Sequence, residues 1–315
     1  MDVLIAEPMA ATDAFLEELR RRYPSANLIL WGENPEAAAR ARVLVAFNLP
    51  DNMKVLPPGI KAIFCFGAGV GHIIADPRVG PDIAVARMLD TGQANQMLDY
   101  ALHAVLARLL DDQHSLNLQK AHRWERPLVP RPHKSELTVA VLGQGHIGEH
   151  ISDGLQQAGF DVRRWTRTRR DGAASAISYG PETLTEVCRG ADVVISVLPP
   201  AAGTENILCM DLFLAMRPGA YIVNLGRGSH VRDADLLSAL NSRHLGAAWL
   251  DVFRQEPLPE NDLYWRHPQV RVTPHRSGLP TINGAAKSLA AFLAALSDGS
   301  PIPGLIRGRR EQSPL

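Results

Sequence analysis

Three polar residues in the C-terminal half of the chain have the types and positions that catalysis requires. Arg227 lies in YIVNLGRGSHV, Glu256 in WLDVFRQEPLP and His275 in VRVTPHRSG. Each follows an apolar, strand-like run, and α/β sheets gather their ligands at the ends of such strands. A guanidinium binds anions, and carboxylate and imidazole groups perform acid–base chemistry. Taken singly, they are equally consistent with a surface ion pair, a solvated loop acid and a structural histidine.

A glycine-rich loop, LGQGHIG, follows the strand-like run TVAVL. Gly143, Gly145 and Gly148 have the G-x-G-x-x-G spacing at a strand–turn–helix junction, which is the context that dinucleotide binding requires. Gly143 allows the tight turn, Gly145 lets the backbone approach a pyrophosphate, and Gly148 lets the helix pack close to the strand. The N–H groups at the start of the helix then face the phosphates. We predict a dinucleotide site; the alternative is a plain tight β–α turn.

The next strand ends in the basic stretch WTRTRR (165–170). In a dinucleotide fold, the residue ~20 positions after the first glycine meets the adenosine ribose, where an Asp or Glu binds the 2′-hydroxyl of NAD. This chain has Thr166, Arg167, Thr168 and Arg169 there instead. Because guanidinium groups match the geometry and charge of a phosphate, we predict binding of the 2′-phosphate of NADP. The alternative is a solvated basic loop or a nucleic-acid patch.

A second glycine-rich loop, FGAGVGH (66–72), also follows a strand-like run but carries His72 where a third glycine is expected. It is a poorer dinucleotide site. Its backbone N–H groups could bind a smaller anion such as a carboxylate. On spacing alone, a flexible turn is equally well supported.

Short apolar runs alternate with helical stretches, which predicts parallel strands with crossover helices. DVLIAE, ANLILW, VLVAF and IKAIFCF are the strand-like runs near the N-terminus. A long helix is expected over 94–111, the alternation restarts after the Pro- and Arg-rich loop 123–136, and a last helix is expected over 282–297. The pattern predicts an α/β protein with two doubly wound units.

The composition excludes several classes of function. Lys and Arg together number 33, as do Asp and Glu, so the net charge of zero argues against bulk binding to nucleic acid or an anionic membrane. We expect no signal peptide and no membrane span. Cys65, Cys188 and Cys209 share no metal-ligand spacing, so no metal site is predicted and a reducing cytoplasm is expected.

Taken together, the motifs resemble the D-isomer-specific 2-hydroxyacid dehydrogenase family, in its glyoxylate/hydroxypyruvate reductase branch. They occur in the family's order: GAGVG, GQGHIG, LPP…TEN, NLGRG, DVFRQEPLP and TPH. The resemblance implies that Arg227 pairs with the substrate carboxylate and polarises the adjacent carbonyl. It also implies that His275 is the general acid and that Glu256 orients it and favours its charged form. The backbone N–H groups of Gly69, Val70 and Gly71 are expected to bind the carboxylate.

The resemblance further implies a Rossmann cofactor domain (101–282) inserted into a flavodoxin-like substrate domain (1–100 plus 283–315). A homodimer through the cofactor domain is expected, with Trp124 near the partner's active site. The cofactor contacts are expected from the glycine loop, the basic stretch, the LPP segment and an aspartate near the nicotinamide: Gly143, Gln144, Gly145, His146, Ile147, Gly148, Thr166, Arg167, Thr168, Arg169, Leu198, Pro199 and Asp251.

The leading hypothesis is NADPH-preferring reduction of small 2-oxo acids such as glyoxylate or hydroxypyruvate. Three departures from the family pattern leave the substrate open: Gly71 replaces an acidic residue, Arg276 replaces a small one, and AFNLP (46–50) lacks an aromatic–proline pattern. One alternative is an NAD-dependent dehydrogenase for another 2-oxo acid. From a different class, a dinucleotide-sensing binding protein without turnover stays open, as does a Rossmann-type hydrolase with bound NAD.

Overall fold

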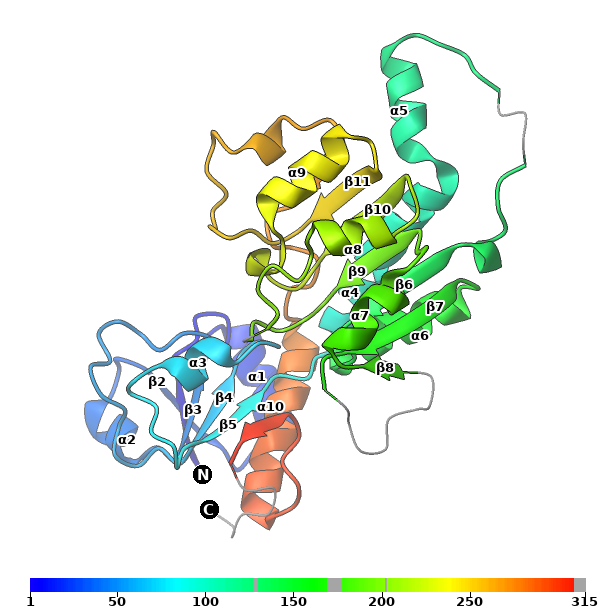
Figure 1. Cartoon of the computed structure of the whole chain (residues 1–315). Coiled ribbons are helices and arrows are strands. Elements are labelled where there is room, and N and C mark those ends of the chain that lie inside the picture. Colours follow the sequence, from blue (N-terminus) through cyan, green and yellow to red (C-terminus); the bar gives the residue numbers. More distant parts are fainter. Residues whose placement is uncertain (127–129, 169–176, 202, 309–315) are drawn as a thin grey trace. The chain divides into compact units, whose positions relative to one another are not determined.

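The computed structural model describes residues 1–126, 130–168, 177–201 and 203–308. Contacts between Cα atoms divide the chain into two compact units, Met1–Gln93 with Pro280–Leu315 (unit 1) and Ala94–Leu279 (unit 2). Each unit has its own sheet (Figure 1). The divisions expected from the resemblance, after residues 100 and 282, lie a few residues further along the chain than these.

Unit 1 is built on a six-stranded sheet in the order β13-β5-β4-β3-β1-β2, in which β13 pairs antiparallel to β5 and the other neighbours are parallel. The order 2-1-3-4-5 is that of flavodoxin-like doubly wound sheets. Every residue of the central strands β3 and β4 is buried, as covered parallel strands require. The strands are β1 (Asp2–Ile5), β2 (Asn27–Leu30), β3 (Val43–Ala46), β4 (Ala62–Cys65), β5 (Ala84–Arg87) and β13 (Leu305–Arg307).

The helices of unit 1 cover this sheet with apolar faces. Phe15, Leu16 and Leu19 of α1 share a core with Phe292 of α10. Thr281 caps α10, since its Oγ1 accepts the N–H of Gly284 at 3.1 Å, and the helix ends at Gly299 with φ of 73°. The helices are α1 (Asp13–Arg22), α2 (Pro35–Arg40), α3 (Gly71–Ala75) and α10 (Ile282–Asp298).

Unit 2 is built on a seven-stranded parallel sheet in the order β12-β11-β10-β9-β6-β7-β8. The chain reverses its direction of winding between β6 and β9, which is where doubly wound sheets bind dinucleotides. The strands are β6 (Thr138–Leu142), β7 (Asp161–Thr166), β8 (Ile177–Tyr179), β9 (Val193–Ser196), β10 (Ala220–Asn224), β11 (Leu245–Leu250) and β12 (Val270–Val272).

Helices lie on both faces of this second sheet because its strands alternate their side chains between two cores. Val139 and Val141 of β6 join the core with α4 and α6, whereas Ala140 and Leu142 join the core with α8 and α9. The helices are α4 (Thr91–Leu110), which contains the division between the units, α5 (Asp112–Lys120), α6 (His146–Gln157), α7 (Pro181–Cys188), α8 (Met210–Ala215) and α9 (Asp233–Asn241).

The predicted α/β fold with two doubly wound sheets is confirmed. In the parallel sheet of unit 2, the segments after β6, β7, β9, β10, β11 and β12 share one edge, the carboxyl ends of the strands. Across the described residues, no helix combines the length and the apolar character that crossing a membrane demands.

Candidate active site

His275 and Glu256 form a hydrogen-bonded pair at this edge of unit 2. Nδ1 of His275 lies 2.7 Å from Oε2 of Glu256, and the side chains are 51% and 37% exposed. A carboxylate only accepts, so Nδ1 carries the hydrogen and Nε2 is left to act outside the pair. The other carboxylate oxygen, Oε1, accepts the N–H of Phe253 at 2.9 Å, which fixes the carboxylate in place. The peptide bond after Glu256 is cis.

Asp251, at the end of β11, holds the loop that carries His275. Its carboxylate is fully buried and accepts the Thr273 hydroxyl at 2.6 Å and the N–H groups of Arg276 and Ser277 at 2.9 Å each. The backbone of His275 also donates to the Asp251 carbonyl at 2.9 Å. His275 has a φ of 48°, a left-handed conformation that L-residues adopt at a cost. The Asp251 bonds on both sides of it maintain that conformation.

Arg227 lies in a tight turn after β10 that is organised by Asn224. The buried Asn224 side chain donates to the Arg227 carbonyl at 2.8 Å and accepts the N–H of Gly226 at 3.2 Å. The Arg227 guanidinium is partly buried, and its Nη1 donates to the Gly226 carbonyl at 2.7 Å. A Cβ on Gly226 would lie 2.8 Å from the Leu198 carbonyl, so glycine is needed there.

His230 stabilises this turn through a hydrogen bond to its backbone, a role that the sequence did not indicate. Its side chain is fully buried, and Nδ1 accepts the N–H of Arg227 at 3.3 Å. Burial lowers the His230 pKa to about 4, and the charge of Arg227 acts in the same direction, while the Pro199 carbonyl opposes them. His230 is therefore neutral at physiological pH. The sequence offers one signal for this role, the position of His230 two residues after NLGRG. The burial of its side chain appears only in the structure.

The Arg227 turn packs directly on the loop that leads to Glu256. A Cβ on Gly228 would lie 1.8 Å from the carbonyl carbon of Phe253. Arg254 ties the same two segments together, since its guanidinium donates to the Val231 carbonyl and, at 3.0 Å, to Asp233. The turn of Arg227 and the loop that carries Glu256 are thus held together within unit 2.

The loop after β6 has the backbone geometry that close approach of a phosphate group requires. Gly143 has φ of 106°, and a Cβ on Gly148 would lie 1.7 Å from the Gly143 carbonyl. Gly145 precedes the first residue of α6, so the loop opens directly into a helix. The residues present therefore fit a dinucleotide pyrophosphate at this loop.

Other predicted cofactor residues lie around the same edge. His146 and Ile147 begin α6 and are partly buried. The Gln144 side chain is buried and donates to the Val141 carbonyl and to Ser152, at 3.2 and 3.1 Å, so only its backbone can face a ligand. After β9, Leu198 is buried and Pro199 is exposed.

The basic stretch follows β7, next to β6 in the sheet. Thr166 ends β7 and is partly buried, and Arg167 and Thr168 are exposed beyond it. Arg169 lies outside the described residues. The two preceding arginines serve the fold instead: Arg163 donates to the Arg189 carbonyl at 2.7 Å, and Arg164 pairs with Asp153 at 2.8 Å.

In unit 1, the loop after β4 carries Gly69, Val70 and Gly71. The Gly69 carbonyl accepts the Cys65 thiol at 3.5 Å, and the Val70 carbonyl accepts the N–H of Ile74 at 3.0 Å. In a trans peptide, the carbonyl and the following N–H point in opposite directions. The N–H groups of Val70 and Gly71 therefore point away from these partners. No group of His, Cys, Asp or Glu in the described part of the chain could hold a metal ion.

These features define a class: a doubly wound α/β protein with a dinucleotide-type glycine loop and an acid–base pair at the same edge of one sheet. Residues 102–277 match the family model of the D-isomer specific 2-hydroxyacid dehydrogenase NAD binding domain. The chain belongs to the D-isomer-specific 2-hydroxyacid dehydrogenase family, and the resemblance read from its motifs is confirmed.

Several relatives, found by sequence or as solved structures, cover nearly the whole chain. A protein of Serratia proteamaculans named glyoxylate/hydroxypyruvate reductase A is 34% identical over 314 residues, which are 97% of this chain and 98% of the relative. The NADPH complex of a family member from Xanthobacter autotrophicus Py2 has a TM-score of 0.87 at 27% identity, with 97% of each chain covered. An NADPH-dependent glyoxylate/hydroxypyruvate reductase of Sinorhizobium meliloti, solved with NADP and sulfate, has a TM-score of 0.83 at 25% identity, with 97% and 98% covered.

Proposed function

We propose that this protein is an oxidoreductase that reduces small 2-oxo acids, glyoxylate and hydroxypyruvate, to 2-hydroxy acids, preferring NADPH and accepting NADH. The observation that carries the proposal is the His275–Glu256 pair at 2.7 Å, on the same sheet edge as Arg227 and the loop of Gly143. The names of the relatives supply the substrate and the cofactor. A pure dinucleotide sensor has no use for such an acid–base pair.

In the reaction, His275 donates the proton at Nε2 to the carbonyl oxygen of the 2-oxo acid. Bound NADPH supplies the hydride that adds to the carbonyl carbon. Glu256 holds the imidazole through Nδ1, which leaves Nε2 to transfer the proton. Arg227 binds the substrate carboxylate and polarises the carbonyl that receives the proton, and the N–H groups of Gly69, Val70 and Gly71 bind the same carboxylate.

On the cofactor side, Gly143, Gly145 and Gly148 would hold the pyrophosphate through backbone N–H groups. Arg167 and Arg169, with Thr166 and Thr168, would hold the 2′-phosphate, because guanidinium groups match the geometry and charge of a phosphate. Leu198 and Pro199 would line the cofactor. Asp251 acts chiefly as a positioning residue for the loop of His275, and its approach to the nicotinamide amide stays a prediction.

The decisive experiment measures oxidation of NADPH and of NADH by the purified protein with glyoxylate, hydroxypyruvate, pyruvate and a bulkier 2-oxo acid. Fast turnover of NADPH with the small acids is the expected result. Tight binding of NADPH with no turnover of any acid would reject the enzyme and favour the sensor.

The cofactor preference has its own test. Arg167→Ala combined with Arg169→Ala removes two charges that pair with a 2′-phosphate, so the NADPH/NADH ratio of kcat/KM should fall about 10-fold or more. Arg20→Ala, an exposed arginine of α1, is the matched control and should leave the ratio unchanged. An unchanged ratio in the double variant would mean that the basic stretch serves another purpose.

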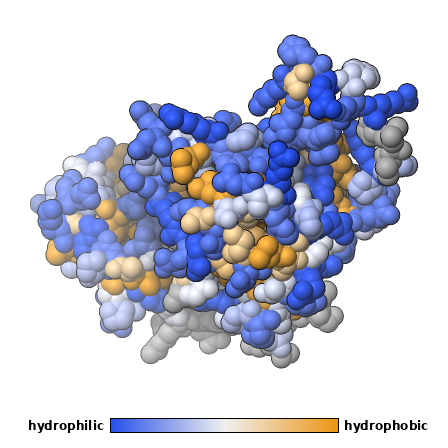
Figure 2. Space-filling view, turned by 45° about the horizontal axis from the view of Figure 1, so that its top comes forward, coloured by the Kyte–Doolittle hydropathy of each residue, from blue (hydrophilic) through white to orange (hydrophobic). Residues whose placement is uncertain are grey.

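We also propose that the protein is a homodimer in a reducing cytoplasm, where Cys65, Cys188 and Cys209 stay as thiols and form no disulfide. Helix α5 projects from unit 2 (Figure 1) and borders a hollow of about 1010 Å³ lined by Leu109, Leu110 and Arg243. Trp124, just after α5, is 96% exposed. Apolar side chains elsewhere on the viewed face form separate small groups in a mostly hydrophilic surface (Figure 2). Sedimentation equilibrium of wild type and Trp124→Ala tests the dimer.

A further inference from the structure

One face of α4 contacts the segment 273–279, which follows β12 and carries the general acid of the proposed reaction. Tyr100 and Gln96 lie about one turn apart on this helix, at i and i+4, so their side chains share a face. Tyr100 contacts Thr273 at the start of the segment, and Gln96 contacts Leu279 at its end. All four residues belong to unit 2, so both contacts lie within one compact unit.

The contact of Tyr100 is the first of two hydrogen bonds in series. Oη of Tyr100 lies 2.9 Å from Oγ1 of Thr273, and that hydroxyl donates to Oδ1 of Asp251 at 2.6 Å. Because the threonine hydroxyl has only one hydrogen, Tyr100 is the donor in the first bond. The same oxygen of Asp251 accepts the N–H of Arg276 at 2.9 Å. Tyr100 therefore orients the hydroxyl that holds the carboxylate beside His275.

The ring of Tyr100 is fixed by its own packing. It meets the buried Trp249 ring edge-on, with centroids 5.9 Å apart and an interplanar angle of 87°. Burial raises the pKa of Tyr100, so its hydroxyl keeps the hydrogen at physiological pH. Tyr100 is thus a permanent donor in a fixed position.

Gln96 binds the other end of the segment with both polar atoms of its amide. Nε2 donates to the carbonyl of Leu279 at 2.9 Å, and Oε1 accepts the N–H of the same residue at 3.2 Å. Between the two ends, His275 has its left-handed φ of 48°. Such a conformation persists only where the surrounding structure holds it. The position of the His275 ring therefore depends on the contacts at both ends of its segment.

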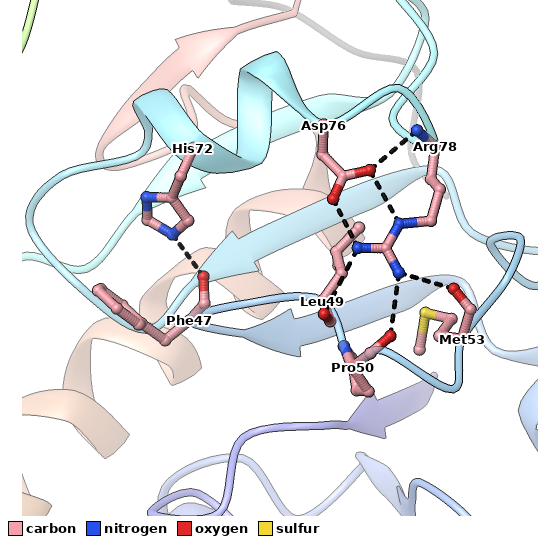
Figure 3. Close-up of polar contacts among 7 residues, drawn as sticks. All are labelled: Phe47, Leu49, Pro50, Met53, His72, Asp76 and Arg78. Carbon is pink, nitrogen blue, oxygen red and sulfur yellow. Dashed lines mark hydrogen bonds and ion pairs between the residues drawn. The ribbon is translucent and has the colours of Figure 1, made fainter.

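The loop between β3 and β4 in unit 1 is held in a different way. One side chain, Arg78, donates to the carbonyls of Pro50 at 2.9 Å and Met53 at 2.7 Å, and Asp76 holds its guanidinium at 2.6 Å (Figure 3). Those bonds fix the middle of a loop. In the segment 273–279, the bonds from α4 fix the two ends and do not occupy the imidazole between them.

We propose that Tyr100 and Gln96 are positioning residues for proton transfer: they hold both ends of the segment 273–279 against one face of α4 and so place Nε2 of His275. This inference rests on the proposed function, in which His275 is the general acid. Glu256 holds the imidazole ring, and the two residues of α4 hold the backbone that carries it. A displacement of a reacting group by ~1 Å lowers a rate by as much as about 10²-fold. Loss of either contact should therefore lower kcat and leave NADPH binding unchanged.

Tyr100→Phe tests the first contact, because it removes the hydroxyl and keeps the ring that packs on Trp249. We expect kcat for glyoxylate, measured with NADPH, to fall about 5–20-fold, and the Kd for NADPH to stay within about 2-fold of wild type. Tyr23→Phe is the matched control. It also removes a tyrosine hydroxyl bonded to another hydroxyl, that of Ser297 at 2.6 Å in unit 1, and should leave kcat unchanged.

The other two contacts have their own variants. Thr273→Val should lower kcat, and Thr273→Ser, which keeps the hydroxyl, should restore most of it. Tyr100→Phe added to Thr273→Val should have little further effect, because both act through one hydroxyl. Gln96→Ala should lower kcat by a factor similar to that of Tyr100→Phe, whereas Gln157→Ala, an exposed glutamine of α6, should not.

The general acid itself separates positioning from a merely structural role. In His275→Ala no imidazole is left to place, so Tyr100→Phe should lower kcat of that variant no further. A structural role of Tyr100 would lower kcat by the same factor in wild type and in His275→Ala.

The outcomes distinguish this inference from the function on which it rests. Turnover of glyoxylate by wild type, with unchanged kcat in Tyr100→Phe and Gln96→Ala, would overturn the positioning role and leave the proposed function standing. An equal loss from Tyr100→Phe in wild type and in His275→Ala would do the same. No turnover of any 2-oxo acid by wild type would overturn both.

Discussion

His275 and His230 both lie on loops that follow strands of unit 2, and their surroundings differ in exposure, in nearby charge and in hydrogen bonding. His275 is half-exposed and bonded through Nδ1 to the carboxylate of Glu256. His230 is fully buried and accepts, through Nδ1, the N–H of Arg227. One imidazole is held as a donor beside a negative charge, and the other as a neutral acceptor beneath a positive one.

The difference shows that the environment of each histidine, and not the residue type, determines its role in unit 2. The carboxylate of Glu256 accepts the hydrogen on Nδ1 of His275 and leaves Nε2 available for proton transfer, which a general acid needs. Burial and the nearby guanidinium lower the pKa of His230 to about 4, so it stays neutral and places no second positive charge beside Arg227. Changes to one histidine should therefore alter proton transfer, and changes to the other should alter anion binding.

The largest effect is expected from His275→Ala. Loss of the general acid should lower kcat for glyoxylate by about 10²–10⁴-fold, the usual contribution of such a group. NADPH binding, followed by fluorescence titration, should stay within a few-fold of wild type because the loop of Gly143 is untouched. Near-normal kcat would remove His275 as the acid, and lost NADPH binding would mean that the substitution disturbs the whole edge.

A smaller effect is expected from Glu256→Gln, which keeps the size of the side chain and removes its charge. A hydrogen bond to a charged group contributes ~1.5–3 kcal/mol, so kcat should fall about 10–100-fold with little change in KM. Steady-state kinetics across pH makes the check, with Glu260→Gln, an exposed acid of the same loop, as the control. A rise in KM at constant kcat would assign Glu256 to substrate binding instead.

The positions of the main site residues could be predicted from the sequence, because they depend on the order of strands and motifs along the chain. The glycine loop at the end of β6 and the three motifs after β10, β11 and β12 lie where strand periodicity placed them. Arg227, Glu256 and His275 then fall on one edge by the rule for parallel sheets. The structure brings Nδ1 of His275 and Oε2 of Glu256 to 2.7 Å, and the role of Glu256 as the orienting group stays a prediction.

The supporting residues could not be predicted, since their roles depend on burial and on contacts across the fold. Asn224 reads as the last residue of a strand, yet its amide shapes the Arg227 turn. His230 looks like a polar loop residue until the structure places it in the interior. Asp251 was assigned to the cofactor from its motif, and its three bonds to the His275 loop appear only in three dimensions.

The acceptor role of His230 gives a third prediction. His230→Phe leaves the N–H of Arg227 without its partner, and an unmet buried donor costs ~1–3 kcal/mol. The KM for glyoxylate should rise about 5–50-fold, with kcat changed less. His230→Asn is the matched variant, because its amide oxygen can take the place of Nδ1, and it should restore most of the wild-type KM. Equal KM values in wild type and His230→Phe would contradict the role.

The buried state of His230 should also appear in the pH dependence of stability. Its pKa is about 4 in the fold, lowered from 6.5, so between these values the unfolded chain binds more protons than the folded one. The stability is therefore complete above pH ~6.5 and falls on acidification toward pH ~4, by at most ~1.4 kcal/mol per pH unit for one group. Glu18 and Asp76, with pKa values of about 2, affect stability only at more acidic pH.

Urea unfolding at pH 7, 6 and 5 tests this. The slope of the free energy of unfolding against pH should be shallower for His230→Asn than for wild type. Identical slopes would mean that His230 takes up a proton in the fold as readily as in the unfolded chain, which would contradict its lowered pKa.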